Sequence, residues 1–195
     1  MKTLFRSLIV FSLFFCASSA SAFQWTIDAD HSEIRFKINH ILTTVSGQFT
    51  EFTGDVQFDP QTPDAGKFDF TVSVKSVDTN NGKRDNHLRS KDFFDADKFP
   101  EMKFQSSKIY HLKDNRYALE GVMTIKDVSR KIQIEFDFFP PQTHPFDKKK
   151  NVAGFQTNFI ISRLAYHVGD GKFLKMGVVG SDVEVEIAME ALTEK

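Results

Sequence analysis

Apolar and polar side chains alternate along most of this 195-residue chain, and this period of two constrains the fold more than any other feature. Successive side chains of a β-strand point to opposite faces, so a strand with one buried face shows this alternation. The segment from Ser32 to Ile41 is an example, and we predict a half-buried strand there. Its apolar face carries Ile34, Phe36, Ile38 and His40, and the other face carries Glu33, Arg35, Lys37 and Asn39.

The alternation recurs in several segments, many of them longer than the five or six residues of an average strand. Long half-buried strands with little helix to cover them form either a sandwich of two sheets or a closed barrel. The apolar set changes parity between Phe49 and Phe52, which predicts a β-bulge near Thr50 or Glu51 and a bend that favours a barrel. The further alternating segments are residues 68–74, 117–125, 132–138, 153–161 and 183–189.

We therefore predict an all-β fold, an antiparallel barrel of about eight strands. Helical spacing appears only around residues 84–91, so one short helix is expected there. No repeat, low-complexity tract or linker divides the chain, which indicates a single domain.

The N-terminus is typical of a secretory signal peptide. Lys2 and Arg6 precede an apolar run at residues 8–15, and small residues follow up to Ala22. We predict cleavage of residues 1–22, a mature domain of residues 23–195 and export from the cytoplasm. The apolar run is about half of the roughly 20 residues that a spanning helix needs, so no membrane-spanning segment is expected. Cleavage would also remove Cys16, the only cysteine, so a disulfide or a thiolate site is excluded from the mature chain.

Charge and motifs argue against several functions. The 25 Lys and Arg residues are interspersed with 26 Asp and Glu residues and form no long basic block, so no nucleic-acid partner is expected. The six histidines show neither HxH nor HExxH spacing, and the sequence has no EF-hand loop, GxSxG elbow or phosphate-binding glycine loop. We expect no metal, no cofactor and no catalytic residues.

The 22 phenylalanines raise the question of what fills the barrel. An outer-membrane barrel would turn its apolar face outward and carry aromatic belts at both ends of its strands. Here the aromatic residues lie in the middle of the strands, which favours an inward apolar face. Two explanations remain: the phenylalanines fill an interior that is only just wide enough for side chains, or they line a cavity for a ligand that is mostly hydrocarbon.

One stretch of the chain carries a family resemblance. Val77-Asp78-Thr79-Asn80 leads into Arg84-Asp85, His87-Leu88-Arg89-Ser90 and Asp92-Phe93, with Pro100 and Phe104 downstream. Together with Trp25-Thr26-Ile27-Asp28, His31-Ser32, Gly47, Phe49, Gly54, Gly121, Thr124, Ile125, Val128 and the segment 160–163, this resembles the YceI family of secreted, lipocalin-like isoprenoid-binding proteins. The chain departs from the family pattern at Ser162-Arg163-Leu164-Ala165-Tyr166, so ligand details at that rim are not transferred.

The resemblance implies a lipocalin-like periplasmic barrel that holds a long apolar chain, and it favours the cavity over the filled core. Inward apolar residues of the predicted strands would line that cavity. We assign this role to Phe36, Ile38, Phe49, Phe70, Val72, Phe136, Phe138, Phe155 and Phe159.

Four polar residues are candidates for the mouth of the cavity, namely His40, Arg84, His87 and Arg89. A helix over residues 84–91 would align several of them along one side, where they could meet a polar head group. Alternatively, this helix is a plug whose charges pair with Asp85, Asp92 or Asp95, and His40 is a hydrogen-bonded core histidine.

The function expected from these features is that of a periplasmic protein that binds or carries an isoprenoid, such as a polyprenyl lipid or quinone, or a similar amphiphile. Two other classes remain open. A secreted interaction module would have a filled core and no lipid, and a lipid-modifying enzyme would have a polar triad inside the cavity, with His40 and His87 as the first candidates. Barrels of this size can pair, so a homodimer is also considered.

Overall fold

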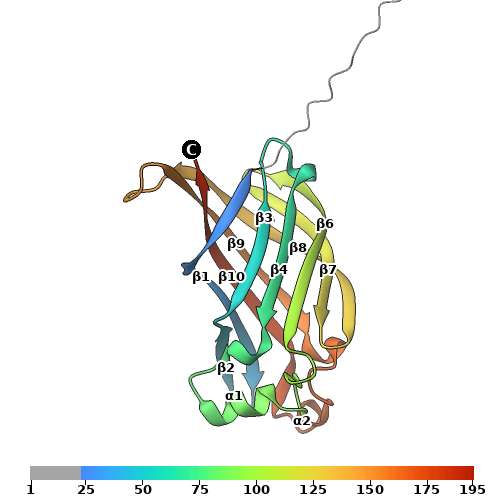
Figure 1. The fold of residues 1–195 in the computed structure, drawn as a ribbon. Coiled ribbons are helices and arrows are strands. Elements are labelled where there is room, and N and C mark those ends of the chain that lie inside the picture. The colour runs from blue at the N-terminus through green and yellow to red at the C-terminus, as the bar shows by residue number, and fades with distance from the viewer. Residues whose placement is uncertain (1–22) are drawn as a thin grey trace, which may run out of the picture.

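The computed structural model describes residues 23–195, and the predicted signal peptide lies outside this range. Eight antiparallel strands form a closed barrel, because the last strand pairs with the first (Figure 1). This confirms the predicted fold. In their order around the barrel the strands are β1 (Gln24–His40), β3 (Phe52–Gln57), β4 (Lys67–Ser73), β6 (Glu101–Lys113), β7 (Arg116–Ile125), β8 (Val128–Thr143), β9 (Lys150–Ser162) and β10 (Val179–Glu194).

Shorter elements extend the barrel at one end. Strand β2 (Thr43–Phe49) pairs with the second half of β1, and β5 (Val77–Asp78) pairs with β2. The predicted helix is present as α1 (Gly82–Arg89), and a second, four-residue helix that was not predicted is α2 (Lys172–Lys175). The remaining helical turns are η1 (Pro63–Ala65), η2 (Val74–Ser76) and η3 (Arg163–Tyr166).

The alternation changes parity at Thr50 and Glu51, as predicted, but the structure at this point is not the predicted β-bulge. Thr50 and Glu51 separate β2 from β3, and both of these strands lie beside β1. The backbone of the two intervening residues bonds to η2 and its N-cap, with Thr50 N donating to Ser76 O and Ser73 N donating to Glu51 O. The chain therefore bends by a break between two strands, and the expectation of a bulge within one strand was wrong. A register shift is present in β1 instead, between Asp28 and Glu33 opposite β10.

Aromatic side chains fill the end of the barrel where β1 begins, which is the upper end in Figure 1. Phe58 is fully buried there, and its ring lies 5.0 Å from that of Phe138 and 5.1 Å from that of Tyr117. Trp25 closes this end, because its Nε1 donates to Phe58 O at 2.9 Å. We call this part of the interior the closed-end core.

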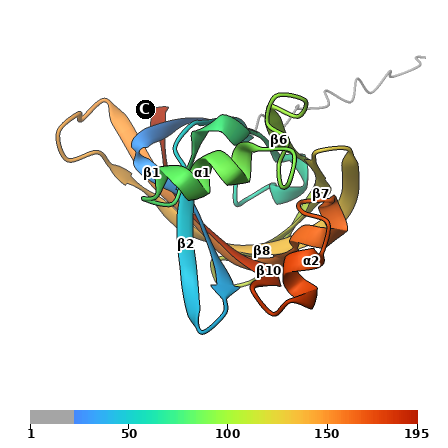
Figure 2. The ribbon, with the colours of Figure 1, turned by 90° about the horizontal axis from the view of Figure 1, so that it is seen from below.

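A second, smaller apolar cluster lies at the other end, beneath the strands. Buried Phe93, Ile125, Tyr166 and Val168 form it, and Leu88 of α1 and Phe173 of α2 pack against them. Lys126 joins its two halves, because its Nζ donates to Phe93 O and to His167 O, both at 2.7 Å. Seen from below, α1 lies on one side of this end and α2 on another (Figure 2). Among residues 23–195, no helix has both the length and the apolar character to cross a membrane.

Candidate ligand-binding cavity

Between the closed-end core and the lower cluster, the barrel encloses a cavity of about 370 Å³. This volume lies within the range of small-molecule sites, about 300–1,000 Å³. Side chains from nearly every strand of the barrel face it, and α1, the 93–94 segment and α2 bound its lower end. The walls are overwhelmingly apolar, so the cavity fits a hydrocarbon.

Most of the predicted apolar residues line this cavity. The set that does so is Phe36, Ile38, Phe49, Phe70, Val72, Phe136, Phe155 and Phe159. Phe138 does not, because it lies within the closed-end core with 2% of its surface exposed. It shares the inward face with Phe136 but stands two residues closer to the filled end. The alternation shows whether a side chain points into or out of the barrel, but it does not show how far along the barrel axis that side chain lies.

The exposure of the inward residues shows where the barrel is hollow. Phe36 and Ile38 face the interior, yet each is only partly buried, since their inner sides border empty space. Phe58 and Phe138 face the same interior at the closed end and are almost completely buried. The phenylalanines therefore fill one half of the barrel and line a cavity in the other.

Three of the four polar residues predicted for the mouth of the cavity lie at the cavity, and one does not. His40, Arg84 and His87 line the cavity, whereas Arg89 does not. The Arg89 guanidinium donates to Lys75 O at 2.8 Å and to Val77 O at 2.7 Å, so it fastens α1 to η2 and β5. Arg89 follows Arg84 by five residues and so stands on a different face of the helix.

Helix α1 is held by a small network at its first turn. Buried Asp85 accepts hydrogen bonds from Thr79 N at 2.9 Å and from Thr79 Oγ1 at 2.5 Å. Arg84 Nε donates to Thr79 Oγ1 at 2.7 Å. The helix is thus a plug with internally satisfied polar groups, and it also presents Arg84 and His87 to the cavity.

The two histidines mark different parts of the site. His87 Nε2 lies 3.1 Å from Asp92 Oδ2, and its side chain is 45% exposed, so the cavity reaches solvent beside it. His40, at the end of β1, is half-buried and borders the cavity. Within the described part of the chain its ring forms no hydrogen bond with another residue, which differs from the hydrogen-bonded core histidine that was considered.

Many more residues line the cavity than the sequence predicted, and three of them are notable. Phe93 and Phe173 stack with their ring centroids 5.8 Å apart, at the lower end of the cavity. Neither lies on a strand, so no periodicity could identify them. The third is Arg163, which belongs to the family-like segment and was not assigned to the site.

Arg163 is 5% exposed, and its guanidinium bonds only to backbone carbonyls. It donates to Gly180 O and Val168 O, each at 2.7 Å, and to Val179 O at 3.3 Å. Burial lowers the pKa of this guanidinium, and the charge of Asp170 opposes that effect. The side chain therefore fastens the η3 loop to the start of β10 and forms part of the cavity wall.

A separate polar cluster lies outside the cavity, at the register shift of β1. Asp28, His31 and Glu190 bring side-chain ligand atoms within 4.8 Å of one another. His31 Nδ1 is 2.9 Å from Asp28 Oδ2, and the histidine is exposed. The geometry is that of a surface ion pair with a neighbouring carboxylate.

The comparisons with known proteins agree with this architecture. A family model described as YceI-like domain matches residues 25–191. A UPF0312 protein of Pectobacterium atrosepticum is 30% identical over 198 residues, covering 100% of both chains. The crystal structure of Burkholderia cenocepacia BcnA is similar with a TM-score of 0.77 and 24% identity, over 84% of this chain and 98% of that one. A polyisoprenoid binding domain from Saccharophagus degradans, implicated in plant cell wall breakdown, is similar with a TM-score of 0.63 and 13% identity, over 87% and 98%.

Proposed function

The chain belongs to the family of YceI-like domains, and on that premise we propose that it binds or carries an isoprenoid, or a similar long-chain amphiphile, inside its barrel. The observation that carries this proposal is the apolar cavity of about 370 Å³. The similar domain from Saccharophagus degradans is a polyisoprenoid binding domain, which supports it further. Export, residence in the periplasm, a cleaved segment of residues 1–22 and a homodimer stay predictions from the sequence.

Hydrocarbon burial explains how such a ligand would be held. Each buried carbon contributes about 0.8 kcal/mol, so one five-carbon isoprene unit contributes about 4 kcal/mol before ordering costs. A few units therefore suffice for tight binding even after those costs. Release would be slow, and the ligand should remain bound during purification.

The polar residues at the lower end would set the orientation of the ligand. Arg84 and His87 of α1 border the cavity where it reaches solvent, and His40 borders it from β1. We propose that the head group lies against these three side chains, with the tail directed toward Phe136 and Phe155. Arg89 and Phe138 are not part of this proposed ligand contact.

The direct test is mass spectrometry of an organic extract of the mature protein, purified from its native periplasm without detergent. We expect a stoichiometric long-chain isoprenoid or acyl lipid. An empty extract, together with no uptake of added polyprenyl lipid or quinone, would rule out the carrier function and leave an interaction module as the better explanation.

Blocking the cavity gives a second test. Val72→Trp places an indole ring within the cavity, and we expect uptake of a fluorescent polyprenyl lipid to fall at least about tenfold, since the space for the tail is removed. Thr71→Trp is the matched control, because the neighbouring residue of β4 points to the opposite face. Equal uptake by both variants would show that the ligand binds elsewhere.

A further inference from the structure

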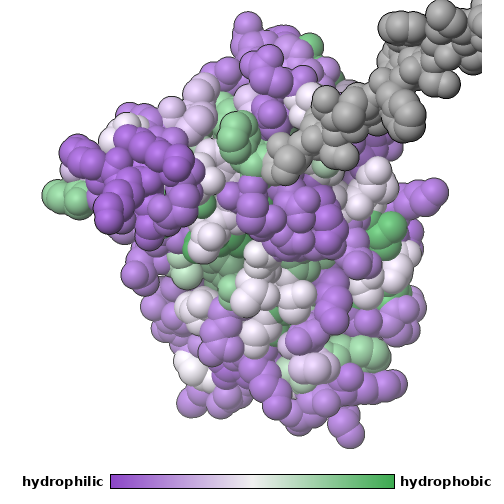
Figure 3. All heavy atoms as spheres, turned by 45° about the horizontal axis from the view of Figure 1, so that its top comes forward, coloured by the Kyte–Doolittle hydropathy of each residue, from purple (hydrophilic) through white to green (hydrophobic). Residues whose placement is uncertain are grey.

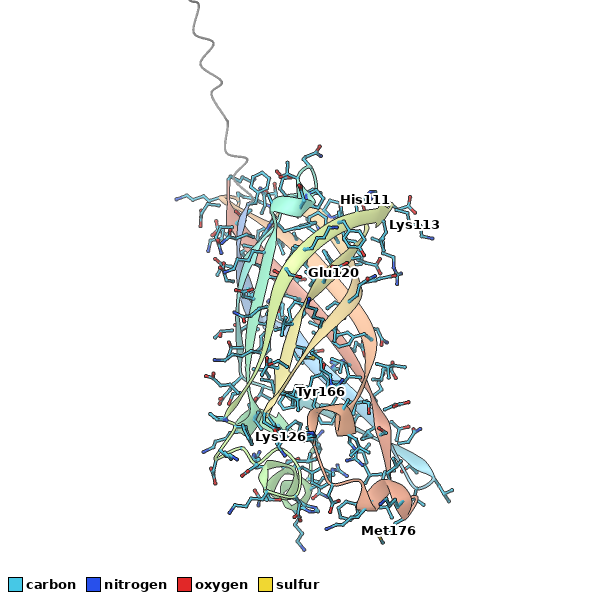
Figure 4. The ribbon with its side chains drawn as sticks, turned by 90° about the vertical axis from the view of Figure 1, so that its right-hand side faces the viewer. His111, Lys113, Glu120, Lys126, Tyr166 and Met176 are labelled. Atoms are coloured by element: carbon cyan, nitrogen blue, oxygen red, sulfur yellow. The ribbon has the colours of Figure 1, made fainter. Side chains whose placement is uncertain are left out.

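Four exposed apolar residues lie at the cavity end of the barrel. Leu42, in the turn between β1 and β2, is 93% exposed, and Met176, at the end of α2, is 69% exposed. Ile41 and Leu174 are exposed beside them. The two segments are adjacent, because Ile41 N donates to Val178 O at 3.0 Å. We call these four residues the apolar rim. Figure 4 shows Met176 at the end of the molecule opposite His111 and Lys113.

The apolar rim is continuous with the cavity through α2. Phe173 of this helix lines the cavity and stacks on Phe93, whereas the next residue, Leu174, is exposed. Val178, which follows α2 and accepts the hydrogen bond from Ile41, lines the cavity again. Exposed apolar residues of the rim are therefore direct neighbours of apolar residues that line the cavity.

Basic residues accompany the apolar rim. Lys172 and Lys175 flank Phe173 and Leu174, and residues 170–178 contain these two basic residues against one acidic residue, Asp170. Residues 82–98, at the same end, have five basic against four acidic residues. Residues 23–195 as a whole are acidic, with 23 basic against 26 acidic residues. These two segments of the cavity end therefore carry a small excess of basic residues on a chain that is acidic overall.

We propose that the apolar rim docks on the surface of a bilayer containing anionic phospholipid, and that the bound amphiphile enters and leaves the cavity there. A surface with apolar tips and flanking lysines matches the chemistry of the interface between head groups and acyl chains. The exchange step rests on the proposed function, because it needs an amphiphile in the cavity. Docking itself does not, and the two parts can be tested separately.

The closed end offers a comparator with similar residues. Phe146, in the loop between β8 and β9, is 94% exposed and precedes Lys148, Lys149 and Lys150. Figure 3 turns this end toward the viewer, and its visible surface is mostly hydrophilic with separate hydrophobic areas. The loop projects from the end of the barrel that is filled, so docking through it would leave the cavity end away from the bilayer (Figure 1).

The test of docking is co-flotation of the mature protein with vesicles of phosphatidylcholine and phosphatidylglycerol, and with vesicles of phosphatidylcholine alone. We expect binding to the anionic vesicles that weakens with added salt. The double variant Leu42→Asp/Met176→Asp should reduce binding at least about tenfold, since it places charge where acyl chains would lie. The control Phe146→Asp should bind like the unaltered protein. Unchanged thermal unfolding verifies that the variants are folded.

Each outcome decides one part of the proposal. No binding of the unaltered protein to anionic vesicles, or a loss caused by Phe146→Asp and not by the double variant, would overturn docking through the apolar rim. If the double variant still takes up polyprenyl lipid from cyclodextrin but exchanges it with vesicles more slowly, docking and exchange are both supported. If the protein binds vesicles through the rim and never takes up lipid from either source, docking stands and the proposed function fails.

Discussion

At the scale of single residues, the fold tolerates a buried cation because of backbone geometry. Arg163 has no carboxylate partner among its hydrogen bonds, and three carbonyl oxygens of residues 168–180 accept from it instead. Gly169, with φ of +86°, makes room for it, since a Cβ at that position would lie 2.5 Å from Nη1 of Arg163. A buried guanidinium thus acts here as a structural clamp on the wall of the cavity.

The pair formed by exposed His31 and partly buried Asp28 gives a pH-dependent prediction. The hydrogen bond with Asp28 raises the pKa of His31 above its usual 6.5, and the same bond lowers the pKa of Asp28 below its usual 3.8. Stabilisation from the raised histidine pKa is complete below about pH 6.5 and disappears as the pH rises through the pKa of the folded state. Stabilisation from Asp28 is lost when the pH falls through its lowered pKa.

NMR titration of the His31 ring protons measures this directly. We expect a midpoint above the ordinary histidine value, and Asp28→Asn should move it back toward that value. Asp97→Asn, at the cavity end of the barrel, is the control and should leave the His31 midpoint unchanged. A midpoint that does not respond to Asp28→Asn would show that the pair is not formed in solution.

At the scale of elements, α1 is too short and too polar to be stable by itself, so its contacts hold it in place. Asn81 caps its N-terminus by accepting from Arg84 N at 3.1 Å, and Asp85 lies in its first turn, where a negative charge is favourable. Thr79, which precedes the helix, bonds to both Asp85 and Arg84. One hydroxyl therefore connects the helix to the strand β5.

Removing that hydroxyl should loosen the helix. Thr79→Val keeps the shape of the side chain but leaves buried Asp85 with one hydrogen bond fewer, which costs about 1–3 kcal/mol in the free energy of unfolding. Amide hydrogen exchange should accelerate across residues 82–94 more than in the strands. Thr71→Val, on the outer face of β4, should change the free energy of unfolding by less than about 0.5 kcal/mol. Uniform acceleration across the barrel would argue against a local role for Thr79.

At the scale of the whole molecule, the barrel divides its interior between two tasks. The closed-end core packs aromatic rings against one another and stabilises the fold, whereas the lower half remains hollow and apolar. An interior of this width is nearly filled by large side chains alone. The packing of large side chains at one end therefore decides which half keeps room for a ligand.

This division predicts unequal effects of similar substitutions. Phe58→Ala creates a new void in the packed half and should lower the free energy of unfolding by about 3–5 kcal/mol. Ile38→Ala removes carbons that are only partly buried, so its effect should be about 1 kcal/mol. Urea denaturation measures both, and lipid uptake should weaken for Ile38→Ala while the folded Phe58→Ala protein retains it. Equal losses of stability would contradict a hollow lower half.

The sequence by itself determined most of the strands, their inner and outer faces, the position of α1 and the family, but β6 was not among the predicted strands. Alternation and helical spacing are local properties, so residues a few positions apart reveal them. The predicted barrel and most of the cavity residues, such as Phe36 and Phe159, follow from this information.

Only the tertiary structure decided how far along the barrel each inward residue lies, and this is where the predictions failed. Phe138 shares a face with Phe136 but packs at the filled end, and Arg89 turns away from the cavity to bind η2 and β5. Phe173 and Arg163 reach the cavity from segments without periodicity. A cavity is the volume that side chains from many strands leave unfilled. Its position depends on residues far apart in the sequence, so a local pattern cannot predict it.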